Sequence, residues 1–151
     1  MKKFTFQNCK NQKYKMYVVS TFFQNLTNPN LQIINYYSSS TKFFWEMNYQ
    51  EKAILQKEMQ NGFNELKKLS QDATVDLIIV DELLECIYNE LISEAELIEV
   101  IQKNLQILKW LFLAIILLII NLINAVDLVS HVQATKHYFY QKVPAHKGIE
   151  Y

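Results

Sequence analysis

The three histidines are the first residues to consider for metal binding or acid–base chemistry. His131, His137 and His146 follow one another at intervals of six and nine residues. Histidines that bind one metal ion from the same helix are about three or four residues apart. The spacing therefore predicts no zinc or haem site.

The acids Asp81, Glu82 and Glu85 are a second candidate, because neighbouring carboxylates can transfer protons or hold a cation. The surrounding pattern predicts a helix, however, and we interpret them as its solvated face. No serine-hydrolase, zinc-protease or P-loop motif is present, and with only Gly62 and Gly148 a glycine-rich phosphate loop is excluded. The chain has no arginine, which counts against a nucleotide or nucleic-acid site. These features predict no catalytic residues, no metal and no enzyme activity.

The longest uncharged apolar run, WLFLAIILLIINLINAV, extends from Trp110 to Val126. As a helix it would be roughly 25 Å long at about 1.5 Å per residue, close to the ~30 Å of a bilayer core. We therefore predict one transmembrane helix over residues 109–127. Lys109, Trp110 and His131 would be its interfacial anchors, because their polar or aromatic groups can reach the lipid headgroups.

Polar residues inside the predicted span lie on one face. Asn121, Asn124 and Asp127 follow one another at intervals of three residues, and a buried amide or carboxylate needs a hydrogen-bond partner. We interpret them as a helix–helix contact in the membrane. A proton or ligand path along Asn124, Asp127 and His131 is the alternative, although one span encloses no path unless it oligomerises.

Residues 46–108 are predicted to be an acidic helical region, with helices at about 48–69, 74–92 and 94–108. Ser93 and Glu96 fit a capping box at the start of the third helix. An apolar stripe with a repeat of about seven residues would pack against a partner subunit, and a helical hairpin that covers itself is the alternative. The stripe consists of Leu77, Val80, Leu84, Ile87, Leu91, Ile98, Ile101 and Leu105.

The two ends of the chain differ in character. Residues 1–45 are a basic, aromatic extension with six lysines and no acid, which we expect to be extended and to lie on a partner. Nucleic-acid bases can stack on such rings, but no recognition motif accompanies them and we expect no nucleic-acid binding. Residues 128–151 are expected to form a C-terminal tail.

These elements predict an all-α membrane protein: one transmembrane helix with amphipathic helical arms and an extended N-terminal segment. In this plan the chain resembles the small single-span accessory subunits of mitochondrial inner-membrane complexes, either the respiratory chain or ATP synthase. Its arginine-free, Asn- and Lys-rich composition resembles that of ciliate proteins.

The resemblance implies a non-catalytic role in the assembly and stability of a respiratory-chain complex in the mitochondrial inner membrane. The expected partners are other membrane subunits and the lipid bilayer, with no cofactor beyond bound lipids such as cardiolipin. An ATP-synthase accessory subunit and an endomembrane coiled-coil tether of the SNARE type are the alternatives.

Overall fold

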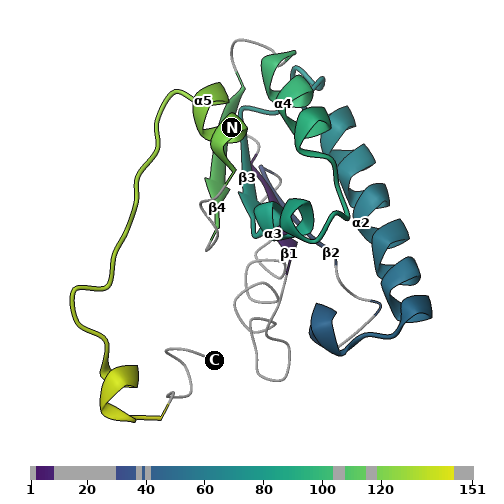
Figure 1. Ribbon diagram of the computed structural model, residues 1–151. Coiled ribbons are helices and arrows are strands. Elements are labelled where there is room, and N and C mark those ends of the chain that lie inside the picture. The colour runs from purple at the N-terminus through teal and green to yellow at the C-terminus, as the bar shows by residue number, and fades with distance from the viewer. Residues whose placement is uncertain are drawn as a thin grey trace.

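The computed structural model describes residues 3–8, 30–36, 39, 42–103, 108–114 and 119–144. A four-stranded sheet lies at its centre, with the strand order β2-β1-β3-β4 (Figure 1). Every strand pair in this sheet is parallel. The strands are β1 (Lys3–Asn8), β2 (Leu31–Tyr36), β3 (Leu77–Asp81) and β4 (Lys109–Leu113).

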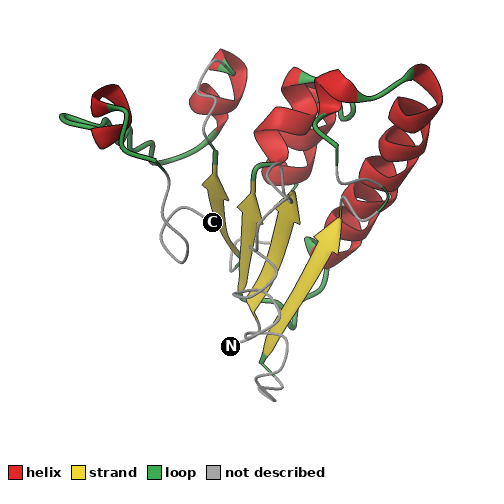
Figure 2. Cartoon of the chain, turned by 90° about the horizontal axis from the view of Figure 1, so that it is seen from below, coloured by secondary structure: helices red, strands yellow, loops and turns green. Residues whose placement is uncertain are grey.

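Helices lie between β2 and β3 and between β3 and β4. The two longest, α2 (Tyr49–Leu69) and α4 (Glu94–Gln102), lie beside one another next to the sheet (Figures 1 and 2). Local capping explains where these two helices begin. The Asn48 side chain accepts a hydrogen bond from the Glu51 N–H at the start of α2, and the Ser93 side chain accepts one from the Glu96 N–H at the start of α4. The helical elements are η1 (Phe44–Glu46), α2 (Tyr49–Leu69), α3 (Leu83–Tyr88), α4 (Glu94–Gln102), α5 (Ile120–Ala125) and η2 (Tyr138–Gln141).

The hydrophobic core lies between the sheet and these helices. One face of α2 contributes its side chains at intervals of three and four residues, as expected of an amphipathic helix packed on a sheet. β3 contributes alternate residues, because successive side chains of a strand point to opposite faces. Fully buried core residues include Leu55, Met59 and Leu66 of α2, Ile78 of β3, Leu83 and Cys86 of α3, and Leu97 of α4.

The predicted all-α membrane fold is wrong, because the apolar run at residues 110–126 is divided between two different elements. Its first residues form strand β4, and α5, later in the run, has only six residues. Among the described residues, no helix is both long and apolar enough to cross a membrane. Strands of parallel sheets read as continuous apolar runs, so a strand followed by an apolar connection was mistaken for one long helix.

The predicted helix at 74–92 is also wrong. The structure has β3 and the short helix α3 in this range. α2 coincides with the helix expected at 48–69, whereas α4 begins at Glu94 as expected but its last residue is Gln102. The expected N-terminal extension at 1–45 contains β1 and β2, and β1 pairs with strands on both of its sides.

Candidate active site

The carboxyl ends of the strands lie at one edge of the sheet, where Asp81 has Gln7 of β1 and Leu113 of β4 as its register partners. The chain passes from β1 to β2 on one side, and from β3 to β4 on the other. Because β1 and β3 are neighbours, their outgoing connections diverge. Ligands of open parallel sheets bind in the crevice at such a point, beyond the carboxyl ends of the strands.

Two acidic residues lie at this edge of the sheet. Asp81 is the last residue of β3, and Glu82 joins it to α3. Glu82 has φ 57° and ψ 18°, a left-handed conformation that costs a non-glycine residue about 1–2 kcal/mol. The Glu82 N–H donates to the Leu113 carbonyl at the end of β4, with 2.8 Å between nitrogen and oxygen. Backbone strain held in this way is frequent at functional sites.

The acids of this segment are partly or fully removed from water. Asp81 is half-buried, and burial raises the pKa of its carboxyl group. Glu85, in the first turn of α3, is only 1% exposed. The interpretation of these residues as a solvated helix face is therefore wrong, because Asp81 belongs to a strand and Glu85 faces the interior.

Adjacent carboxylates at a sheet edge are suited to a metal–phosphate ligand. Mg²⁺ is commonly held by one or two carboxylates together with the phosphate oxygens of a substrate. Within the described residues, no group of three or more histidines, cysteines and acids is placed to hold a metal ion. Asp81 and Glu82 are the two carboxylates at this edge that could hold such a cation.

An aromatic pair follows the carboxyl end of β2. The rings of Phe43 and Trp45 are stacked, with centroids 4.5 Å apart and 8° between their planes. Trp45 is 68% exposed, although a ring of this size is usually covered by protein or ligand. We call Phe43 and Trp45 the aromatic platform. η1, which contains Trp45, and α3 lie towards the same end of the sheet (Figure 1).

The residues expected at a membrane interface lie elsewhere. Lys109 and Trp110 belong to β4, where the Trp110 ring stacks on Phe112. His131 is exposed in the segment after α5.

The three polar residues expected to form a contact in the membrane are near α5. The Asn121 side chain donates to Glu94 Oε2 over 3.2 Å, which links α5 to α4. Asn124 and Asp127 are exposed. Asn121 therefore makes a contact within the chain.

The apolar stripe is distributed over several elements instead of one helix face. Val80, Leu84 and Leu91 are buried, and Ile87, Ile98 and Ile101 are partly buried against the same core. Leu77 is the first residue of β3, and Leu105 lies outside the described residues. The buried members of the stripe pack within the chain's own core, so the predicted surface for a partner subunit along this stripe is wrong.

Both parts of the site were visible in the sequence but were misinterpreted. The run LIIVDE, in which apolar residues are followed at once by two acids, is typical of a buried strand that ends at a site. The same leucines and valines also fit a seven-residue helical repeat, so the sequence alone does not distinguish the two. Phe43 and Trp45 belong to a basic, aromatic segment in which no motif sets them apart from the other rings.

The fold is a parallel α/β domain, and its candidate ligand site is the edge where the connections from β1 and β3 diverge. The model of the ATP:corrinoid adenosyltransferase BtuR/CobO/CobP family matches residues 1–151, and the chain belongs to this family. No curated protein was found to match the chain.

The family assignment corrects the functional expectations. The family is one of enzymes, so the expectation of a non-catalytic protein is wrong. The expected accessory subunit of the respiratory chain or ATP synthase, and the alternative of a SNARE-like tether, are wrong as well. The expected partnership with membrane subunits and the single-pass location in the mitochondrial inner membrane are wrong too. Both depended on the predicted span, and no described helix is long and apolar enough to form one.

Proposed function

We propose that this chain transfers the adenosyl group of ATP to a corrinoid. The observation that carries the proposal is the acid pair Asp81–Glu82, placed at the carboxyl end of β3 in a parallel sheet, in a member of this family. The aromatic platform at the same end of the sheet supports it.

The acid pair would serve the triphosphate of ATP. The half-buried Asp81 carboxylate favours the approach of a positive charge, because a cation offsets the cost of keeping a carboxylate away from water. A Mg²⁺ ion shared between Asp81 and the phosphates would neutralise the charge that collects on the triphosphate as it leaves.

The aromatic platform would serve the corrinoid. A corrinoid is a nearly flat macrocycle around cobalt, and flat ring systems stack well on exposed aromatic side chains. The exposed Trp45 ring, supported from behind by Phe43, offers such a surface.

In the transfer, the cobalt of a fully reduced corrinoid donates an electron pair to the 5′-carbon of ATP. The cobalt–carbon bond forms as the bond from that carbon to the triphosphate oxygen breaks, and the triphosphate leaves with the bonding pair. The protein contributes by holding the two substrates in line and by stabilising the leaving charge.

The composition of the chain favours a second candidate function, corrinoid binding with little or no transfer. The sequence has no arginine, and residues 9–29, which follow β1, contain three lysines but no glycine. Glycines let the backbone approach phosphates closely in many α/β nucleotide sites. The family assignment outweighs this observation, and measured turnover decides between the two functions.

An adenosylation assay tests the proposal, with ATP, Mg²⁺ and a chemically reduced corrinoid. Asp81→Asn removes the charge with little change in shape, and we expect kcat/KM for ATP to fall about 100-fold. Asp76→Asn is the matched control, because Asp76 lies beside the opposite end of the same strand. If wild-type protein binds the corrinoid without turnover, the second candidate function is established. Equal activity of Asp81→Asn and Asp76→Asn would show that the Asp81 charge has no role in the reaction.

A further inference from the structure

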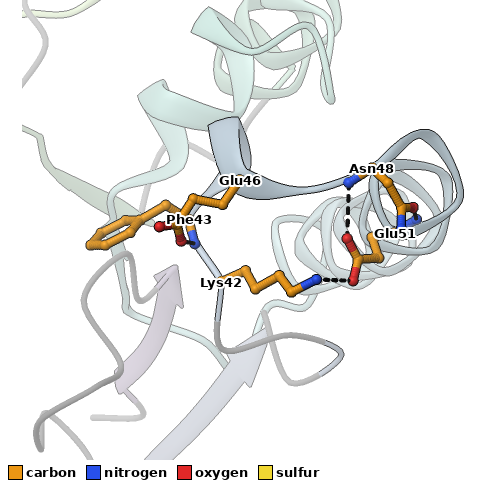
Figure 3. A network of polar contacts seen from close by, with 5 residues as sticks. All are labelled: Lys42, Phe43, Glu46, Asn48 and Glu51. Carbon is orange, nitrogen blue, oxygen red and sulfur yellow. Dashed lines mark hydrogen bonds and ion pairs between the residues drawn. The ribbon is translucent and has the colours of Figure 1, made fainter.

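Glu51 uses both of its carboxylate oxygens to connect two separate points of the chain. Its Oε1 accepts a hydrogen bond from Lys42 Nζ over 2.5 Å, and its Oε2 accepts one from the Asn48 N–H over 2.8 Å (Figure 3). In return, the Glu51 N–H donates to Asn48 Oδ1 over 2.9 Å. One side chain in the first turn of α2 therefore contacts residues on both sides of η1.

The segment between these two points contains the aromatic platform. Phe43 follows Lys42 directly, and Trp45 lies in η1, before Asn48. Within the segment, the Phe43 N–H donates to Glu46 Oε2 over 3.0 Å, and the Glu46 N–H donates to the Phe43 carbonyl over 2.9 Å. Glu51 therefore links the two ends of the loop 42–48, and hydrogen bonds between Phe43 and Glu46 stabilise its middle.

We propose that Glu51 is a positioning residue for corrinoid binding, which holds the aromatic platform in place by closing the loop 42–48. The inference rests on the proposed function, because it assigns the platform to the corrinoid. A loop that is already ordered loses less conformational entropy when a ligand binds, so closure improves affinity without any contact between Glu51 and the ligand.

The exposure of Lys42 and Glu51 indicates whether loss of their contact would affect mainly ligand binding or mainly stability. The Lys42 and Glu51 side chains are 50% and 30% exposed, and exposed ion pairs contribute little to global stability. The hydrogen bond from Lys42, followed by that from the Asn48 backbone, lowers the pKa of Glu51, so the carboxylate is charged and the loop is closed at neutral pH. Removing Glu51 should therefore weaken corrinoid binding more than it weakens the fold.

Glu99 provides a matched control. It pairs with Lys103, the residue directly after α4, and both side chains are exposed. The hydrogen bond from Lys103 lowers the pKa of Glu99, as that from Lys42 does for Glu51. This pair lies outside the loop 42–48. Glu99→Ala therefore removes an equivalent ion pair without opening the loop.

The experiment compares Glu51→Ala, Glu51→Gln and Glu99→Ala in the full chain. We expect Glu51→Ala to raise the KM for the corrinoid about tenfold, while kcat and the KM for ATP stay within about twofold of those of Glu99→Ala. Glu51→Gln should be intermediate, because its amide oxygen still accepts from the Asn48 N–H but no longer pairs with a charge. Equal corrinoid KM values for Glu51→Ala and Glu99→Ala would overturn the proposal.

Trp45 fluorescence makes this test independent of turnover. Trp45 and Trp110 are the two tryptophans of the chain, so a Trp110→Phe background isolates the signal of the platform. We expect lower anisotropy and stronger acrylamide quenching of Trp45 in Glu51→Ala than in Glu99→Ala. If wild-type protein binds no corrinoid, the proposed function fails, and equal Trp45 anisotropy in the two variants would then refute the positioning role separately.

Discussion

Replacing Trp45 by alanine separates ligand binding from folding most clearly. The ring is 68% exposed and stacks on the Phe43 ring, with 4.5 Å between centroids. Stacking of a flat ligand on an aromatic side chain is worth about 1–3 kcal/mol, which corresponds to about a 5- to 150-fold weaker Kd for the corrinoid. Loss of the Phe43 stack costs about 0.5–1.5 kcal/mol, or about 1–6 °C in Tm for a chain of this length.

Calorimetric titration with the corrinoid measures the binding change, and thermal unfolding monitors the fold. Tyr49→Ala is the control. Tyr49 is 88% exposed at the start of α2, so this substitution also removes an exposed aromatic ring. Trp45→Phe should retain much of the affinity, since a smaller ring still stacks. The reasoning is refuted if Trp45→Ala and Tyr49→Ala bind the corrinoid with affinities within about twofold of each other.

Three further predictions concern the acid pair Asp81–Glu82 and the core. Burial raises the pKa of Asp81, so the folded state binds a proton at this carboxyl group more tightly than the unfolded chain does. Urea unfolding should therefore show that wild type gains stability relative to Asp81→Asn as pH falls from about 6 to 4. A loss of relative stability over this pH range would contradict the assigned burial. Because Glu82 is left-handed, Glu82→Gly should be about 1 kcal/mol more stable than Glu82→Ala in the same assay, and equal stability would show that the turn is unstrained. Leu97 is completely buried, so Leu97→Ala should lower the unfolding free energy by about 2–5 kcal/mol, whereas a loss below about 1 kcal/mol would mean that the site is loosely packed.

Local signals in the sequence were sufficient where neighbouring residues alone decide the structure. The apolar face of α2 repeats at intervals of three and four residues, and Ser93 ends one segment and begins α4. Helical periodicity and capping depend on contacts within about one turn of the chain, so they can be recognised without knowledge of the rest of the fold.

The same reasoning failed for the strands. The apolar residues of β3 and β4 occur in runs that fit a buried strand, a buried helix or a membrane span equally well. Pairing with β1 and with one another makes them strands, and such pairing involves residues that are far apart in the sequence.

The composition of this protein follows from its sequence alone, as do the cap at Ser93 and the amphipathic face that α2 turns to the core. The candidate site does not. Phe43, Trp45 and Asp81 lie towards one end of the molecule only because β2 and β3 run parallel within one sheet, so that the segments following both strands leave at the same edge. Strand direction and order are set by long-range backbone hydrogen bonds, which no local pattern of side chains records.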